Sequence, residues 1–298
     1  MPPQDGVDQL DRAAERRTED RLLDRLRADG TSRVVVVAGD AVPLASAGSV
    51  AWVPPHAVAP DAEWAFLGFT ADGVARLVAV LADPRADPPF AAAAGWSGLR
   101  TVAPAVAPVE VDAVITALSL GRWLRDAPFC VRCGSRSEVR SAGWSRRCPA
   151  CGLEDFPRTD PAVIVGVTSA ADPDLLLLGA NAAWGGRMYS CFAGFVEAGE
   201  SLEATVHREL AEEAGVALRD VRYRGSQPWP FPRSLMCGFL ATAIDDGLAR
   251  PDGEEIVDVR WFHRDEIGAA LSGDSDFALP GPASIAHRLI AGWHAEQA

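Results

Sequence analysis

The sequence contains no lysine: all 28 of its basic residues are arginine, against 41 acidic residues. Mechanisms that need an ε-amine, such as a phosphate-loop lysine, a Schiff base or a nucleotidyl-lysine intermediate, are therefore excluded. Every fixed positive charge is a guanidinium, which suits bidentate contacts to phosphates and carboxylates. With a formal net charge of −13, the chain is a poor general binder of long nucleic acids or anionic membranes.

Long apolar runs and a dense set of cysteines are also absent. Residues 5–29 are charged throughout, unlike a secretory signal, and no window approaches the roughly 18 to 20 apolar residues of a membrane span. Six cysteines in 298 residues are too few for a disulfide scaffold. We therefore expect a cytoplasmic protein of about two domains with no membrane partner.

Residues 1–127 are expected to form a mixed α/β domain without a catalytic motif, used for packing or dimerisation. Its charged first 30 residues are interpreted as either disordered or helical, and residues 82–108 as a loop. The apolar pattern predicts three strands and then a helix, at Val34–Val37, Trp64–Phe69, Val74–Leu81 and Val111–Leu124.

Four of the six cysteines form two pairs, Cys130-x2-Cys133 and Cys148-x2-Cys151, and a glycine follows each pair. Four thiolates close a tetrahedral site with no open position, which is typical of structural Zn²⁺. We therefore predict a zinc ribbon at residues 128–157, with iron or a redox pair of disulfides as alternatives. The two remaining cysteines, Cys191 and Cys237, lie in apolar surroundings and are interpreted as buried thiols.

The ribbon segment is basic within an acidic chain, since residues 128–158 hold six arginines and three carboxylates, a surplus of 6 − 3 = 3. One hypothesis is that these arginines contact phosphates, for example those of RNA. The alternative is an ordinary solvated face. The arginines are Arg132, Arg136, Arg140, Arg146, Arg147 and Arg158, and the carboxylates are Glu138, Glu154 and Asp155.

Residues 158–298 are expected to form one further domain of alternating strands and helices. Helices are predicted at Ser201–Ala214, Arg264–Leu271 and Ala283–Ala295, the first with Ser201 as N-cap and Gly215 after its end. Strands are predicted at Ala162–Thr168, Leu175–Leu178, Met188–Phe192, Val221–Arg224, Leu235–Ile244 and Ile256–Phe262.

The first of these helices carries a cluster of glutamates. At about 100° per residue, Glu209, Glu212 and Glu213 share one face, and Val206 and Leu210 occupy the adjoining face. Close carboxylates repel one another unless cations bind there, and oxygen ligands suit Mg²⁺ or Mn²⁺. Such ions neutralise a diphosphate and activate water for attack at phosphorus. A solvated, charged helix face is the alternative interpretation.

The spacing of the cluster resembles the Nudix box, G-x5-E-x7-R-E-U-x-E-E-x-G-U, where U is a bulky aliphatic residue. Every position is matched between Gly194 and Val216. The resemblance implies the Nudix fold, an α/β (α+β) arrangement with a mixed sheet between helices, and hydrolysis of a nucleoside diphosphate linked to another group.

The same resemblance assigns roles within the box. Arg208 would orient the glutamates and take part in catalysis. Glu212 would bind the cation or help to prepare the attacking water. The catalytic cation, Mg²⁺ or Mn²⁺, would be held by Glu209, Glu212, Glu213 and the carbonyl of Ala193.

A second motif, S-Q-P-W-P-F-P-R-S-L-M, spans residues 226–236. Its three central prolines stiffen the chain, and Trp229 and Phe231 offer flat surfaces on which a base can stack, although a rigid structural loop is the alternative. The motif resembles the specificity motif of the NADH pyrophosphatase (NudC-like) branch of Nudix hydrolases, and the preceding zinc ribbon is another mark of that branch. The resemblance covers residues 128–298 well and the amino-terminal domain loosely.

This resemblance implies a homodimer that cleaves NAD(H) to nicotinamide mononucleotide and AMP, and, as in bacterial members, removes the NAD cap from RNA 5′ ends. It implies Glu255 as a further metal ligand. It places twelve residues at the substrate: Phe156, Phe195, Gln227, Pro228, Trp229, Pro230, Phe231, Pro232, Arg233, Ser234, Ala286 and, on a weak alignment, Arg100.

Two departures from the family pattern leave open the preference between free dinucleotide and RNA cap. Phe156 stands where some members have a tyrosine, and Gly143 replaces an acidic residue. Two other functions were weighed: a pyrophosphatase for another compound such as ADP-ribose, and a non-catalytic binding module. A silent module would be expected to lose box glutamates, and all are present here.

Overall fold

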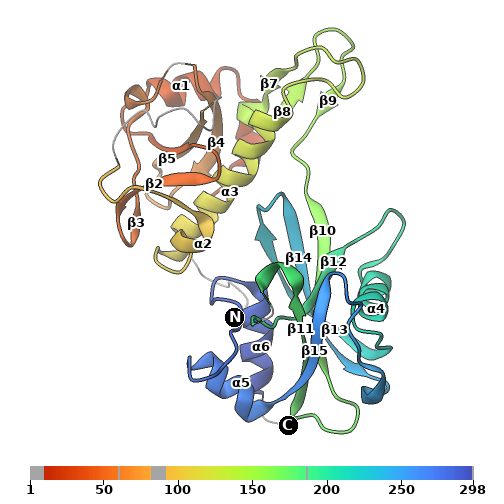
Figure 1. The fold of residues 1–298 in the computed structure, drawn as a ribbon. Coiled ribbons are helices and arrows are strands. Elements are labelled where there is room, and N and C mark those ends of the chain that lie inside the picture. The colour runs from red at the N-terminus through yellow and green to blue at the C-terminus, as the bar shows by residue number, and fades with distance from the viewer. Residues whose placement is uncertain (1–9, 60, 82–91, 186, 297–298) are drawn as a thin grey trace. The chain divides into compact units, whose positions relative to one another are not determined.

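The computed structural model describes residues 10–59, 61–81, 92–185 and 187–296, within two compact units, Met1–Arg158 and Thr159–Ala298 (Figure 1). The predicted loop at 82–108 therefore lies partly outside the described residues, as do residues 1–9. The three-part division into 1–127, 128–157 and 158–298 stays a prediction. Among the described residues, no helix has the length and apolar character needed to cross a bilayer.

A three-stranded sheet forms the centre of the first unit. Its strands β1 (Arg33–Val37) and β5 (Ala75–Val80) are parallel, and β4 (Glu63–Phe69) is antiparallel to β5. Alternate valines of β1 face opposite sides, so that Val34 and Val36 join a core with α1 (Leu22–Ala28), while Val37 lies close to Gly121 of α3 (Pro108–Asp126). The predicted strands and helix are confirmed with small shifts of their ends.

The remaining elements of this unit are short. The charged amino-terminal segment is helical in two places, at η1 (Ala14–Thr18) and α1. A second sheet has the order β3-β2-β6. The predicted loop was wrong at residues 96–102, which form β6 and α2, because elements of three or four residues leave no periodic pattern. The bounds are β2 (Ala41–Ser46), β3 (Ser49–Val50), η2 (Pro55–Ala57), β6 (Trp96–Gly98) and α2 (Leu99–Val102).

The cysteine-rich segment forms an antiparallel ribbon of three strands at the end of the first unit. The elements are β7 (Glu138–Arg140), η3 (Ser141–Gly143), β8 (Ser145–Arg147) and β9 (Glu154–Asp155). Gly143 has a φ of 96°, and a Cβ there would lie 2.2 Å from the Cβ of Ala65 in β4. Gly143 is thus required by close packing, and an acidic side chain has no room at this position.

The second unit is a six-stranded mixed sheet of order β13-β14-β10-β11-β15, with β12 paired to β10. Strands β10 and β14 are parallel, and the other pairs are antiparallel. The bounds are β10 (Asp160–Thr168), β11 (Leu175–Asn181), η4 (Ala182–Trp184), β12 (Phe192–Phe195), β13 (Leu218–Trp229), β14 (Ser234–Ala243), η5 (Asp246–Leu248) and β15 (Ile256–His263).

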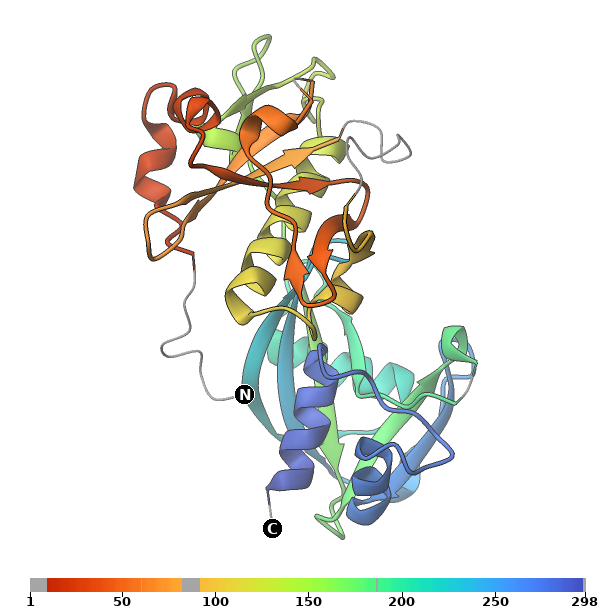
Figure 2. The same ribbon diagram turned by 90° about the vertical axis from the view of Figure 1, so that its left-hand side faces the viewer.

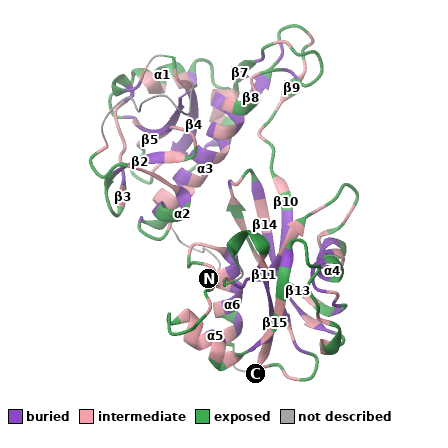
Figure 3. Cartoon of the chain, viewed as in Figure 1, coloured by how far each residue is buried: buried purple, intermediate pink, exposed green. Residues whose placement is uncertain are grey.

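Helices cover both faces of this sheet. In Figure 2, α6 (Ile285–Ala295) lies in front of the sheet and α4 (Leu202–Glu213) behind it, while α5 (Arg264–Leu271) packs beside α6. Along β10, Val163 and Val165 join the core under α4, and Ile164 joins the core under α6. Figure 3 shows β10 as mainly buried. The predicted α/β fold class, with a mixed sheet between helices, is confirmed.

Two predictions in this unit were wrong. Residues 188–191 make only isolated bridges, and the strand starts at Phe192, where pairing with β10 begins. The motif at 226–236 is not a free loop, because β13 continues to Trp229 and β14 starts at Ser234. Pro228 fits within β13 because β13 is an edge strand, where a missing N–H breaks no ladder.

Candidate active site and zinc centre

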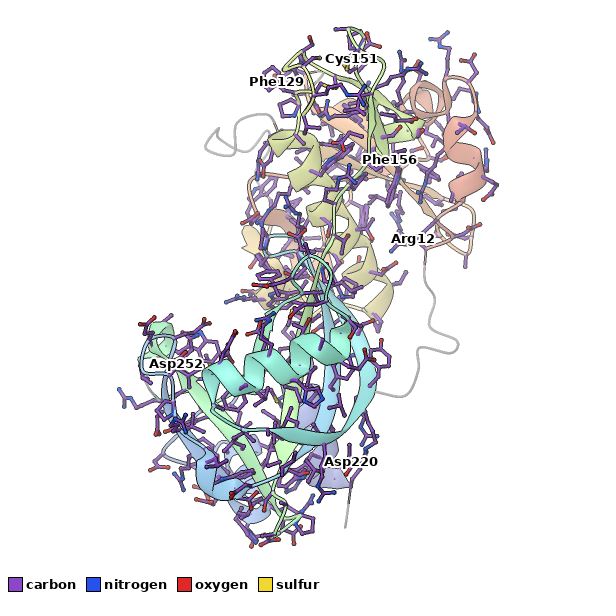
Figure 4. All side chains as sticks on the ribbon, turned by 90° about the vertical axis from the view of Figure 1, so that its right-hand side faces the viewer. Arg12, Phe129, Cys151, Phe156, Asp220 and Asp252 are labelled. Carbon is purple, nitrogen blue, oxygen red and sulfur yellow. The ribbon has the colours of Figure 1, made fainter. Side chains whose placement is uncertain are left out.

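The four ribbon cysteines converge on one point. Their Sγ atoms all lie within 4.8 Å of one another, and the pairs Cys130–Cys151 and Cys133–Cys148 are separated by 3.6 and 3.5 Å. Tetrahedral Zn²⁺ with Zn–S bonds of about 2.3 Å requires sulfur atoms about 3.8 Å apart. The cysteines therefore fit a structural zinc ion without rearrangement. Cys151 is labelled in Figure 4.

Backbone hydrogen bonds prepare this site for a cation. Each pair closes a tight turn, with the N–H of Gly134 donating to Cys130 and that of Gly152 to Cys148. Hydrogen bonds from Ser135 lower the pKa of Cys133 to about 6, which favours the thiolate. In contrast, burial raises the pKa of Cys191 to about 12, as expected for an inert thiol.

The arginines of the ribbon are mostly engaged in contacts within the first unit. Arg146 is 1% exposed and donates to Glu63 and to the carbonyls of Leu124 and Ser137. The exposed guanidinium of Arg147 lies, by strand register, between Glu138 and Glu154. Two further ion pairs are Arg140–Glu138 and Arg158–Asp155. This pairing favours a structural role for the ribbon over a phosphate-binding role. The hypothesis that the ribbon arginines contact phosphates was wrong for Arg146, because that side chain is buried.

Capping residues fix where the acidic helix α4 begins and ends. The Oγ of Ser201 accepts the N–H of Ala204, and Gly215 ends the helix at a φ of 67°. Between these caps Glu209 and Glu213 are buried at 8% and 6% exposure, whereas the side chain of Glu212 is 60% exposed. One face of the helix thus holds two buried carboxylates and one carboxylate open to solvent.

Arg208 connects these carboxylates. Its Nη1 donates to Glu209 at 2.9 Å and to Glu212 at 3.0 Å. Its Nε and Nη2 donate to the two carboxylate oxygens of Glu200, and Nη2 also donates to the carbonyl of Phe195. The same contacts hold the pKa of Glu200 at about 2. Glu200 is therefore a positioning residue, which the sequence analysis matched to the box without assigning it a role.

Glu213 has a buried carboxylate oxygen that suits a cation. Its Oε2 is buried and has no hydrogen-bond partner among the described residues. Burial, together with the charges of Glu209, Glu255 and Asp252, raises the pKa of Glu213 to about 8. A buried oxygen of this kind, under the charges of other carboxylates, suits a divalent cation with oxygen ligands. In the part of the chain that the structure describes, only the four ribbon cysteines already lie close enough together to hold an ion, so the glutamates would draw together on binding one.

Strand β12 makes room for the cluster. A Cβ at Gly194 would lie 1.8 Å from the Oε1 of Glu209, so only glycine allows the carboxylate to rest against the strand. The backbone N–H of the neighbouring Ala193 lowers the pKa of Glu213, against the larger effects that raise it. The Ala193 backbone therefore lies near Glu213, and its carbonyl as a metal ligand stays a prediction.

Glu255, which precedes β15, belongs to the same cluster, because its charge raises the pKa of both Glu209 and Glu213. The Nδ2 of Asn181 donates to the Oε1 of Glu255 at 3.1 Å, and the N–H of Ala182 donates to its carbonyl. Asp252, which lies beside one end of α4 in Figure 4, accepts the N–H of Glu255. Sequence analysis missed Asn181, which no local motif marks.

The second motif forms a hairpin between β13 and β14. Gln227 donates to the carbonyl of Ala283, and its Oε1 is buried without a donor among the described residues. The rings of Trp229 and Phe231 meet edge to face at 5.3 Å. Arg233 pairs with Asp160 at 2.9 Å, which ties the hairpin to β10. Pro230 and Ser234 are buried, whereas Pro228 and Pro232 are exposed.

The other predicted substrate residues are scattered. Phe195 lies at the end of β12 with 51% exposure, and its carbonyl contacts Arg208. Ala286 of α6 is 5% exposed and belongs to the core between α6 and the sheet, so a ligand has little access to it. Phe156 (49% exposed; Figure 4) and the exposed Arg100 belong to the first unit, and their part in the site stays a prediction.

Two protein families match this chain, one over the domain with the acidic helix and one over the cysteine ribbon. Residues 158–279 match the NUDIX domain family, and residues 125–156 match the NADH pyrophosphatase zinc ribbon domain. The match to the ribbon family confirms the predicted ribbon and supports its structural zinc.

Relatives match over most of the chain. A protein of Mycobacterium bovis named NAD-capped RNA hydrolase NudC is 44% identical over 280 residues, which cover 91% of this chain and 85% of the relative. Its namesake in Mycobacterium tuberculosis is 43% identical over the same lengths. That of Chromobacterium violaceum is 42% identical over 70% of this chain and 74% of its own. The chain therefore belongs to the NADH pyrophosphatase (NudC) family of Nudix hydrolases.

Proposed function

We propose that this enzyme hydrolyses the diphosphate bond of NAD(H), giving nicotinamide mononucleotide and AMP, and that it also removes the NAD cap from RNA 5′ ends. The observation that carries the proposal is the carboxylate cluster with its unpartnered Glu213 oxygen, in a chain 44% identical to a NAD-capped RNA hydrolase. The complete cluster argues against a non-catalytic binding module.

Glu209, Glu213, Glu255 and the carbonyl of Ala193 would hold Mg²⁺ or Mn²⁺, with Glu212 at the solvent side. Such cations neutralise the diphosphate and lower the pKa of a bound water. Arg208 bridges Glu209 and Glu212, offsets the repulsion between their charges and orients both by donating to both. The exposed Glu212 would accept a proton from the water that attacks phosphorus, as the phosphoanhydride P–O bond breaks.

The hairpin of β13 and β14 would bind the nicotinamide side. The buried Oε1 of Gln227 is a free acceptor, which suits an amide N–H of the ligand. Trp229 and Phe231 supply aromatic surface next to it. ADP-ribose lacks the carboxamide, so a contact to Gln227 would favour NAD(H) over that alternative substrate.

A product-resolved assay tests the proposal. Zinc-loaded enzyme with Mg²⁺ or Mn²⁺ is given NADH, NAD⁺, ADP-ribose and NAD-capped RNA, and the products are separated. We expect the mononucleotide and AMP from NADH, and a 5′-monophosphate from the capped RNA. Turnover of ADP-ribose alone, or of none of these compounds by folded protein, would overturn it.

The same assay compares kcat/KM for free NAD(H) and capped RNA. The paired ribbon arginines argue against the ribbon as the main RNA contact. Two further properties are proposed on family grounds, a homodimer and a cytoplasmic location. Light scattering of the purified protein measures its mass in solution. A mass of 31.6 kDa, that of the monomer, would contradict the homodimer.

A further inference from the structure

The first unit contains an open pocket, lined by both charged and apolar side chains, that the hydrolytic function does not use. Its volume is about 490 Å³, which lies in the range of small-molecule sites. The walls come from α1, from η2 and from β4, and α1 contacts both of the other elements (Figure 1). Its lining residues are Arg21, Asp24, Arg27, Ala28, Pro55, His56, Val58 and Trp64.

Trp64 is the independent sign that this cavity takes a ligand. The side chain is 5% exposed, and its indole N–H is buried without an acceptor among the described residues. A buried donor left unpaired shifts the folding equilibrium against the folded state by about 5- to 150-fold. Trp64 lines the cavity, so a ligand oxygen that reaches this N–H as it binds would remove that penalty.

The charges around the cavity specify an anion. Arg27 lies over the Trp64 ring at 4.5 Å and forms no ion pair among the described residues. Arg21 pairs with Asp24 at 3.1 Å with both side chains exposed, so its guanidinium keeps free donors. His56 adds an imidazole from the opposite wall. Two guanidiniums against one carboxylate leave a net positive site in a chain of net charge −13.

We propose that this cavity binds a small phosphate monoester of about mononucleotide size. The three terminal oxygens of a monoester can accept from donors on three elements at once, here Arg27 of α1, His56 of η2 and Trp64 of β4. A carboxylate has only two oxygens, and an RNA phosphodiester has two that are free. The guanidinium groups provide the bidentate contacts that phosphate prefers.

Indole N–H signals of ¹⁵N-tryptophan-labelled protein test the site directly. The chain has nine tryptophans, and Trp64→Phe assigns the signal of interest by removing it. Zinc-loaded protein without Mg²⁺ or Mn²⁺ is titrated with AMP, ribose 5-phosphate, adenosine, acetate and an uncapped oligoribonucleotide. We expect the Trp64 signal to shift with the two phosphate monoesters and not with adenosine or acetate.

Two arginines of the same helix provide matched variants. Arg27→Gln should weaken the effect of AMP on the Trp64 signal by about tenfold, since a charge-assisted contact is lost. Arg25→Gln removes the same charge from an exposed arginine that pairs with Glu19 outside the cavity, and it should leave the titration unchanged. The other eight indole signals verify that both variants are folded.

Four results would overturn the proposal. The Trp64 signal could fail to shift with both monoesters, or could shift as much with adenosine as with AMP. It could shift more with the oligoribonucleotide than with AMP, or the response to AMP could weaken equally in Arg25→Gln and Arg27→Gln. The third result would assign the cavity to an RNA backbone instead.

Discussion

Arg208 donates two hydrogen bonds to Glu200, from Nε to Oε1 at 2.7 Å and from Nη2 to Oε2 at 2.9 Å. This bidentate pair fixes the plane of the guanidinium, so that the remaining N–H groups point at Glu209 and Glu212. Glu200 is itself held by Thr205 and by the backbone of Glu197. The orientation of the site therefore depends on a carboxylate that lies outside the proposed ligand set.

Glu200→Gln tests this dependence. An amide keeps the shape but loses the charge that holds Arg208, so we expect kcat for NADH to fall about 10–100-fold with a smaller change in KM. Glu203→Gln is the control. It changes an exposed residue of α4, the helix that carries Arg208, and should leave kcat unaltered. Equal activity of Glu200→Gln and Glu203→Gln would show that the ion pair between Arg208 and Glu200 does not position the site.

Glu213 should make the stability of the metal-free protein depend on pH. Its pKa is raised from 4.5 to about 8 in the folded state, so the folded protein holds this proton more tightly than the unfolded chain does. Stability is then greatest below about pH 4.5 for this group and is lost as the pH rises toward 8.

Glu213→Gln should therefore stabilise the metal-free protein at pH 8, by about 1–3 kcal/mol, while abolishing hydrolysis. Urea denaturation at several pH values measures the unfolding free energy of both proteins. It shows whether the variant is more stable at pH 8 and whether it lacks the pH dependence of the wild-type protein. Mg²⁺ or Mn²⁺ should raise the Tm of the wild-type protein more at pH 8 than at pH 6. A variant that is less stable than wild type at pH 8 without metal would contradict the assignment.

Asn181→Ala should weaken the binding of the catalytic cation by about 10–100-fold, because Glu255 loses the amide that orients it. The half-maximal Mn²⁺ concentration for NADH hydrolysis measures the change, and saturating Mn²⁺ should restore most of kcat. Asn181→Gln, which keeps the amide on a longer stem, should recover part of the affinity. No change in the Mn²⁺ requirement of Asn181→Ala would exclude this role.

Arg146 and Arg147 are adjacent yet should behave in opposite ways. Arg146→Ala leaves two carbonyls without this donor and leaves Glu63 with only the longer Arg136 contact, and we expect a loss of about 3–5 kcal/mol in unfolding free energy. Arg147→Ala changes an exposed residue and should stay within about 0.5 kcal/mol. Normal stability of Arg146→Ala with a selective loss of RNA turnover would instead support the ribbon as an RNA contact.

Features carried by local spacing could be predicted from the sequence. The zinc cysteines lie within 22 residues of one another, and the box glutamates lie on a single helix between Ser201 and Gly215. Such patterns need only turn chemistry and helix geometry. The prediction of buried thiols at Cys191 and Cys237 succeeded for the same reason, since their neighbours are apolar.

Contacts between distant segments could not be predicted. Asn181 and Glu255 are 74 residues apart, and Arg146 and Glu63 are 83 apart. The strand at Phe192 depends on its register against β10, and the extent of β13 depends on its place at the sheet edge. These features arise from tertiary pairing, which a single sequence does not display.

The buried guanidinium of Arg146 has a consequence for how the ribbon can be reused. Its acceptors come from the strand of Glu63, from the carboxyl end of α3 at Leu124 and from Ser137. Transplanted alone, the ribbon would lose two of these three acceptors and the packing that buries Arg146. The ribbon is thus not a portable module: zinc removal by a chelator should melt the amino-terminal sheet in the same cooperative step.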